Sequence, residues 1–138
     1  ADGVIQAYVD DAKLSWVDVD DVALVAALAL TYPNKHKGKT YRLSSDAKTF
    51  DEIAALMTQI VGKPYRYEPL SPEVFLQDMQ NSVAEMTYMR CVYEHWKRHA
   101  AGTIPGASET FDHFFEVTGK QPMQWADFIE KHQAELEY

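Results

Sequence analysis

The stretch "WVDVDDVALVAALAL", which runs from Trp16 to Leu30, decides how this chain is organised. Asp18, Asp20 and Asp21 lie within four positions, and the nine residues after them carry only aliphatic side chains. The three acids either form a binding site or mark the point where a strand passes into a helix. The choice determines whether the stretch carries chemistry of its own.

A calcium loop of the EF-hand type does not fit these acids. It needs the pattern D-x-[DN]-x-[DN]-G, and Val22 and Ala23 stand where the third acid and the glycine belong. The residues instead favour a junction between two elements. We expect Asp18 on the polar face of a strand, and Asp20 or Asp21 as the N-cap of the helix that follows.

The segments on either side of the acids support this junction. Leu14–Val19 alternates apolar and polar residues, as a short strand with one polar face does. Val22–Thr31 is apolar on every side, which is typical of a helix buried all round. The longest uncharged apolar run, Val22–Tyr32, is far too short to span a bilayer, so we expect no membrane partner.

Composition limits the classes of partner. The chain has 138 residues, 46% of them hydrophobic, and is predicted to form a single domain, residues 1–138. Its net charge of −8 argues against nucleic acid as a partner, because phosphates bind a basic face. The single cysteine, Cys91, favours a reducing, cytoplasmic setting, and we expect it to be a buried core residue.

Further elements follow from caps and periodicity. Strands are expected at Thr40–Leu43 and Tyr65–Pro69. Thr49 and Glu52 form a T-x-x-E capping box for a helix that Gly62 and Pro64 end. The other expected helices open at Ser71-Pro72, run from a Ser82–Glu85 box to about Ala101, and close the chain at Glu109–Thr118 and Gln124–Glu137. Three strands spaced by helices indicate the edge of a larger parallel sheet.

The sequence contains residues that could ligate a metal or act in catalysis, but their spacing does not fit a known metal-binding or catalytic motif. His95 and His99 have the i, i+4 spacing of zinc-binding pairs, but the cations Lys97 and Arg98 lie between them. Nothing in the sequence supports a third ligand from Asp112, His113 or Glu116. We therefore predict no metal site and no catalytic residue. No glycine-rich phosphate loop occurs in the sequence, which argues against a dinucleotide site within this chain.

Aromatic residues are numerous in the second half of the chain. They could line an apolar pocket, although stripes at helical spacing are more often plain core. The set consists of Tyr88, Tyr93, Trp96, Phe111, Phe114, Phe115 and Trp125.

Three segments in this order resemble the C-terminal half of NmrA-like proteins, which are atypical relatives of the short-chain dehydrogenases/reductases. They are "LSWVDVDDVALVAALAL", "GKTYRLSSDAKTFDEIAALMTQIVGKPYRYEPLSPEVF" and "FEVTGKQPMQWADFIEKH". The resemblance covers about Gly3 to His132. The chain departs from the family pattern at its last helix, where Met123 and Gln124 replace the usual Ser or Thr of the cap.

The resemblance implies an α/β fold: a mostly helical substrate-binding lobe with about three short strands from the edge of a parallel Rossmann-type sheet. Family members begin with a Rossmann half whose glycine loop supplies most of the NAD(P) site, and these residues lack it. The expected cofactor is therefore none in this chain and NAD(P)H in a full-length relative.

Two functions remain open. The chain is either part of an NAD(P)H-dependent reductase or redox-sensing regulator, or a stand-alone binding module derived from that lobe. In the second case a homodimer would cover the surface that otherwise meets the Rossmann half. The expected ligand is a small apolar or carbonyl-type compound. Its expected contacts, which combine aromatic surface with polar groups, are Trp16, Asp18, Tyr93 and Trp96.

Overall fold

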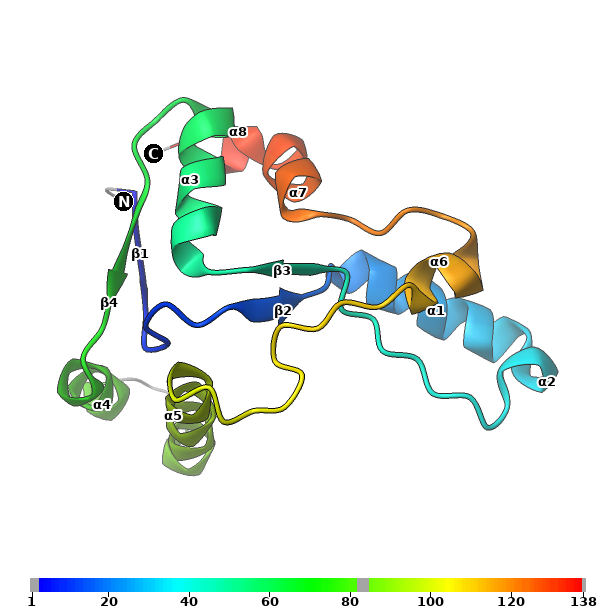
Figure 1. Ribbon diagram of the computed structural model, residues 1–138, viewed down its shortest axis with the longest axis horizontal. Helices are drawn as coiled ribbons and strands as arrows, with labels where there is room; N and C mark the ends of the chain where they lie inside the picture. The colour runs from blue at the N-terminus through cyan, green and yellow to red at the C-terminus, as the bar shows by residue number, and fades with distance from the viewer. Residues whose placement is uncertain (1–2, 82–84, 138) are drawn as a thin grey trace.

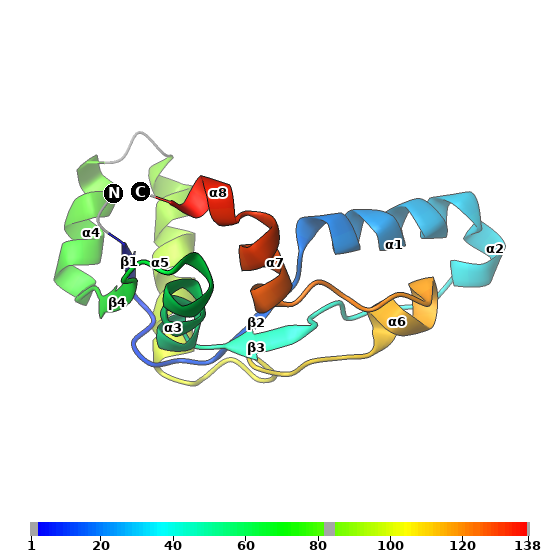
Figure 2. The ribbon, with the colours of Figure 1, turned by 90° about the horizontal axis from the view of Figure 1, so that it is seen from above.

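The computed structural model describes residues 3–81 and 85–137. The molecule is elongated, with a body at one end and a narrower arm at the other (Figures 1 and 2). Within the described ranges it contains four short strands and eight helices. The α/β class with a mostly helical lobe, predicted from the sequence, is confirmed.

The body is built around a parallel pair of strands. β1 (Val4–Ala7) pairs with β4 (Arg66–Pro69), with Val4 opposite Arg66. The sequence predicted β4 but missed β1. A buried cluster lies between α3 (Phe50–Val61) and the closing helices, and it consists of Ile53, Met57, Val61 and Ile129.

Helix α3 begins and ends where the sequence predicted. The Glu52 N–H donates to the Thr49 hydroxyl at 3.1 Å, and the Glu52 carboxylate accepts from the Thr49 N–H at 2.8 Å. Gly62 ends the helix in the left-handed conformation, with φ of 77°. Local sequence chemistry is therefore sufficient to define this element.

The second pair of strands is antiparallel and connects the body to the arm. β2 (Leu14–Trp16) pairs with β3 (Asp46–Lys48), so the prediction of parallel pairing throughout was wrong. The predicted strand at Thr40–Leu43 does not form. Arg42 bonds instead to the beginning of α6 (His113–Thr118), where its N–H donates to His113 Nδ1 at 2.8 Å.

The arm consists of α1 (Val19–Thr31), α2 (Pro33–His36) and α6 (His113–Thr118). Within α1, all of which the structure describes, Val25 is the one buried residue. Leu30 is 82% exposed and Val22 is 40% exposed. The predicted burial of this helix on all sides is therefore wrong, because its main packing partners among the described elements are α2 and α6.

Two helices at the other end of the body, α4 (Pro72–Asn81) and α5 (Met86–Ala100), pack against each other. The predicted S-x-x-E box includes Ser82, which lies outside the described residues. Glu85 is itself the N-cap of α5, and its carboxylate accepts from the N–H groups of Thr87 and Tyr88. Cys91 is exposed on α5, so the expectation that it is a core residue was wrong.

The closing helices are shorter than predicted. α6 begins at His113 and not at Glu109, because the hydroxyls of Ser15 and Ser44 both donate to the Glu109 carbonyl. The last predicted helix is divided at His132 into α7 (Trp125–Lys131) and α8 (Gln133–Leu136). No helix in the described ranges is long and apolar enough to cross a membrane.

The contribution of the buried cluster to the free energy of unfolding can be tested by substitution. Ile129 is 0% exposed, whereas Leu30 on α1 is largely in solvent. We expect Ile129→Ala to lower the free energy of unfolding by about 2–5 kcal/mol, because it leaves a cavity. Leu30→Ala should change it by about 0.5 kcal/mol or less. Urea denaturation measures both, and equal losses would contradict this account of the core.

Candidate functional site

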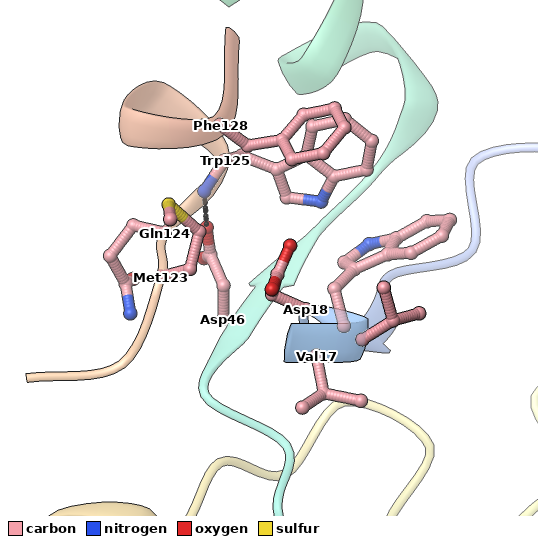
Figure 3. A pocket seen from close by; sticks show the side chains of 9 residues that line it. Val17, Asp18, Asp46, Met123, Gln124, Trp125 and Phe128 are labelled. Carbon is pink, nitrogen blue, oxygen red and sulfur yellow. Dashed lines mark hydrogen bonds between the residues drawn. The ribbon is translucent and has the colours of Figure 1, made fainter. Parts of the chain in front are cut away.

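A cavity of about 350 Å³ lies where the body meets the arm. It is bounded by the end of β2, the beginning of α1, β3 and the beginning of α7 (Figure 3). Its lining residues come from positions 16–19, 46 and 123–128, so the two ends of the chain build it together. They are Trp16, Val17, Asp18, Val19, Asp46, Met123, Gln124, Trp125 and Phe128.

Three of the nine lining residues are aromatic. The rings of Trp16 and Trp125 meet edge to face, with centroids 5.3 Å apart and planes at 84°. Phe128, one helical turn after Trp125, meets it at 77° with centroids 5.8 Å apart. Aromatic side chains of this kind provide apolar contact area for a flat, uncharged ligand.

The beginning of α7 is held in place by three carboxylates. Three consecutive backbone N–H groups, of Met123, Gln124 and Trp125, each donate to an aspartate. The acceptors are Asp21 of α1 at 2.8 Å, Asp127 of α7 at 3.2 Å and Asp46 of β3 at 3.1 Å. The last of these is drawn in Figure 3. Because charge-assisted hydrogen bonds are the stronger ones, these contacts fix the wall that carries Trp125.

Asp46 is almost fully buried, at 8% exposure, and its charge is matched. One carboxylate oxygen accepts from the Ala47 N–H at 2.8 Å and lies 3.1 Å from Lys48 Nζ. The other oxygen accepts from Trp125. Both oxygens are therefore occupied, and Asp46 serves as a structural anchor below the cavity.

Asp18 is the N-cap of α1. Its Oδ1 accepts from the Asp20 N–H at 2.8 Å, and its backbone is extended, with φ −73° and ψ 142°. The expectation that Asp20 or Asp21 caps this helix was therefore wrong. Asp20 instead lies 3.5 Å from Lys131 Nζ, and Asp21 binds Met123. Asp18 and Asp21 thus accept backbone hydrogen bonds, and Asp20 forms an ion pair. Asp18 also lines the cavity.

The four predicted ligand contacts do not lie together. Trp16 and Asp18 line the cavity, but Tyr93 and Trp96 lie on α5 and are absent from its lining. Tyr93 stacks on Tyr8, with ring centroids 5.5 Å apart and planes at 18°. Trp96 contacts the rings of the two histidines of α5.

Several lining residues were missed from the sequence. Val17, Asp46, Met123, Gln124 and Phe128 were not proposed as ligand contacts, and Trp125 was named only within a wider aromatic set. The i, i+3 spacing of Trp125 and Phe128 on a short helix was a usable signal for that wall. No local signal marked Asp46, since its partner lies 79 residues away.

The histidine pair on α5 lies apart from this cavity. Nε2 of His95 and Nε2 of His99 are 3.0 Å apart. Burial, with the charges of His95 and Arg98, holds the pKa of the His99 imidazole below its usual value. Across the described ranges, no group of three or more His, Cys, Asp or Glu residues is placed to hold a metal ion.

Comparison with known proteins places the chain in a family. The model of the NmrA-like family matches residues 3–129, which is most of the chain. The chain belongs to the NmrA-like family. The match includes the β2–α1 junction, β3 and all but the last part of α7, so it contains every lining residue of the cavity.

Two relatives of this NmrA-like chain are reductases about twice its length. It is 28% identical over 125 residues to an NAD(P)H azoreductase of Xenophilus azovorans, covering 90% of this chain and 42% of the relative. It is 30% identical over 132 residues to a (4-alkanoyl-5-oxo-2,5-dihydrofuran-3-yl)methyl phosphate reductase of Streptomyces griseus, covering 94% and 45%. The chain thus spans less than half the length of these relatives.

Solved structures share the fold. The triphenylmethane reductase of Citrobacter sp., solved in complex with NADP(H), is 25% identical with a TM-score of 0.73, over 94% of this chain and 44% of that one. The NADPH-dependent quinone oxidoreductase QOR2 of Escherichia coli is 22% identical with a TM-score of 0.75, over 94% and 46%. At this identity the second likeness supports the fold alone.

The Asp21 carboxylate provides a test of how α7 is held. Burial raises its pKa above the ordinary value, and the charges of Asp18 and Asp20 raise it further, while the Met123 N–H lowers it in part. The folded chain therefore binds this proton more tightly than the unfolded chain. The resulting stabilisation is complete below the unfolded pKa and is lost as pH rises through the folded pKa.

We expect Asp21→Asn, which keeps an acceptor for Met123 but does not titrate, to become more stable relative to the wild type as pH rises from about 3.5 to about 7. Asp21→Ala should lose about 1–3 kcal/mol, because the Met123 N–H is left unpaired. Asp20→Asn, at an exposed ion pair, is the matched control and should change the free energy by about 0.5 kcal/mol or less. A pH-independent difference for Asp21→Asn would contradict the assignment.

Proposed function

We propose that this chain forms the substrate-binding lobe of an NAD(P)H-dependent reductase or redox-sensing regulator, and that it lacks a dinucleotide site of its own. The observation that carries the proposal is the cavity lined by Trp16, Trp125 and Phe128, which is built entirely from the segment that the NmrA-like family model matches. Its ligand would be a small apolar or carbonyl-type compound.

The separation of lobe and cofactor site is supported by the sequence and by the relatives. The 138 residues contain no glycine-rich loop of the kind that binds pyrophosphate. The azoreductase and the quinone oxidoreductase carry NAD(P)H or NADPH in their names, and each of the two is more than twice as long as the part that this chain matches. We propose that the dinucleotide site of such a protein lies in the part that has no counterpart here.

Only two of the four predicted ligand contacts line the cavity. Trp16 supplies aromatic surface to the lining, and Asp18 supplies a carboxylate. Tyr93 and Trp96 pack within the α4–α5 end of the body, so the proposed ligand contacts are Trp16 and Asp18. No catalytic group is proposed in this lobe.

The exposed face of α1 supports an alternative function. Val22 and Leu30 leave apolar surface in solvent, and such surfaces usually meet a partner. In the first proposal the rest of the reductase covers this face. In the alternative the chain is a stand-alone binding module and a second copy covers it, in the reducing, cytoplasmic setting suggested by the single Cys91.

A ligand titration tests the substrate-binding lobe. Trp16, Trp96 and Trp125 are the three tryptophans of the sequence, so a Trp96→Phe background leaves fluorescence from the two cavity tryptophans. We expect acetophenone, a small aromatic ketone, to quench it saturably, with a dissociation constant on the order of 0.1–1 mM. Calorimetry should detect no binding of NADPH.

A charge inside the cavity provides the matched control for this titration. Val17 and Val74 are similarly exposed, at 41% and 44%, but only Val17 lines the cavity. Val17→Lys should abolish saturable quenching, whereas Val74→Lys should leave it unchanged. Micromolar binding of NADPH would overturn the missing dinucleotide site, and quenching that never saturates would overturn the cavity as a ligand site.

Light scattering tests the alternative. A homodimer that forms through the exposed face of α1 should have twice the mass of the chain at about 100 μM. It should dissociate when Leu30→Lys places a charge in the interface. Val74→Lys, on α4, should leave it intact. A monodisperse monomer of the wild-type chain would rule out the stand-alone dimer and leave α1 for the rest of a longer protein.

A further inference from the structure

We propose that the cavity selects ligands that carry a hydroxyl group on an apolar, aromatic body, in preference to the matching carbonyl compounds. The inference rests on the proposed ligand-binding function and adds the chemical class that the cavity recognises. It follows from a comparison of which polar groups of the lining are occupied and which are not.

The first unoccupied group is a donor. Trp125 Nε1 is buried and has no hydrogen-bond partner in the described part of the chain. Figure 3 shows this indole nitrogen facing the space in which the Asp18 carboxylate also lies. A buried N–H without a partner is costly, so this one calls for an acceptor on the ligand.

The second unoccupied group is an acceptor. Asp18 uses Oδ1 to accept the N–H of Asp20 at the cap of α1. An ionised carboxylate has about four acceptor positions on two oxygens. No hydrogen bond or ion pair to the other oxygen is found among the described residues, and the carboxylate points into the cavity (Figure 3). This oxygen calls for a donor on the ligand.

The polar side chains of three other lining residues have hydrogen-bond partners. Trp16 Nε1 donates to the Lys48 carbonyl at 3.2 Å, and Gln124 Nε2 donates to the Ser45 carbonyl at 3.1 Å. Both oxygens of Asp46 accept hydrogen bonds. The nine lining residues include two carboxylates and no Lys, Arg or His. An anionic ligand is therefore disfavoured.

A hydroxyl satisfies both groups through one oxygen. It accepts from the Trp125 N–H and donates to Asp18, whereas a carbonyl or an ether can only accept. A carbonyl oxygen placed beside Asp18 would face a carboxylate with no proton between them. An ammonium group could only donate and would leave Trp125 unpaired. The aromatic walls then bind the apolar remainder of the ligand.

A matched set of four uncharged compounds tests the inference on the full chain by calorimetry. 1-Phenylethanol carries the hydroxyl, acetophenone and (1-methoxyethyl)benzene can only accept, and ethylbenzene can do neither. We expect 1-phenylethanol to bind about tenfold more tightly than the two acceptors, as one hydrogen bond to a charged group allows.

Two substitutions should separate the contributions. Asp18→Asn keeps the cap, since Asn caps helices as well as Asp. It should remove the preference for the alcohol over the ether. Trp125→Phe keeps a ring but loses the N–H, so it should weaken the alcohol, the ketone and the ether by a similar factor, and by more than it weakens ethylbenzene. Trp96→Phe, away from the cavity, should alter none of the four.

A spectroscopic readout on the wild-type chain keeps the test valid if a variant fails to fold. The Trp125 indole proton should shift downfield in NMR spectra when 1-phenylethanol is added, and should not do so with ethylbenzene. Equal affinities for all four compounds, with no indole shift, would overturn the hydroxyl preference alone. Failure of every compound to bind, ethylbenzene included, would overturn the proposed ligand site as well.

Discussion

Three consecutive N–H groups at the beginning of α7 depend on three aspartates, and most of the structure around the cavity follows from these contacts. Asp21, Asp127 and Asp46 come from α1, α7 and β3, so one short segment joins the arm, the closing helix and the antiparallel strands. The hydrogen bonds position Trp125 against Trp16. Without them α7 would keep its packing on α3 but lose its fixed relation to α1.

The features that could be predicted are those that depend on residues close together in the sequence. The capping box of Thr49 and Glu52 and the stop at Gly62 require only neighbours in sequence, and α3 has the predicted bounds. The junction of strand and helix at Asp18 was also predictable, because alternation gives way to a continuous apolar run there. Even so, the capping residue was misplaced, since Asp18, Asp20 and Asp21 are equally good caps by type.

The contacts that define the cavity could not be predicted, because they join distant segments. Asp21 and Met123 are 102 residues apart, and Asp46 and Trp125 are 79 apart. An aspartate at position 21 reads as a helix-terminal acid, and nothing near it indicates a partner on α7. The burial of α1 was mispredicted for a different reason. Its apolar residues favoured a fully buried helix, but the described chain buries only one side of it.

The position of the cavity at the meeting point of both ends of the chain links ligand binding to folding as a whole. The aromatic walls come from positions 16 and 125–128, and they face each other only when the intervening hundred or so residues have folded. A partly folded chain therefore has no cavity, and a ligand has nothing to bind in it. A ligand that bound only the folded site, as proposed above, would raise the free energy of unfolding of the entire lobe by mass action.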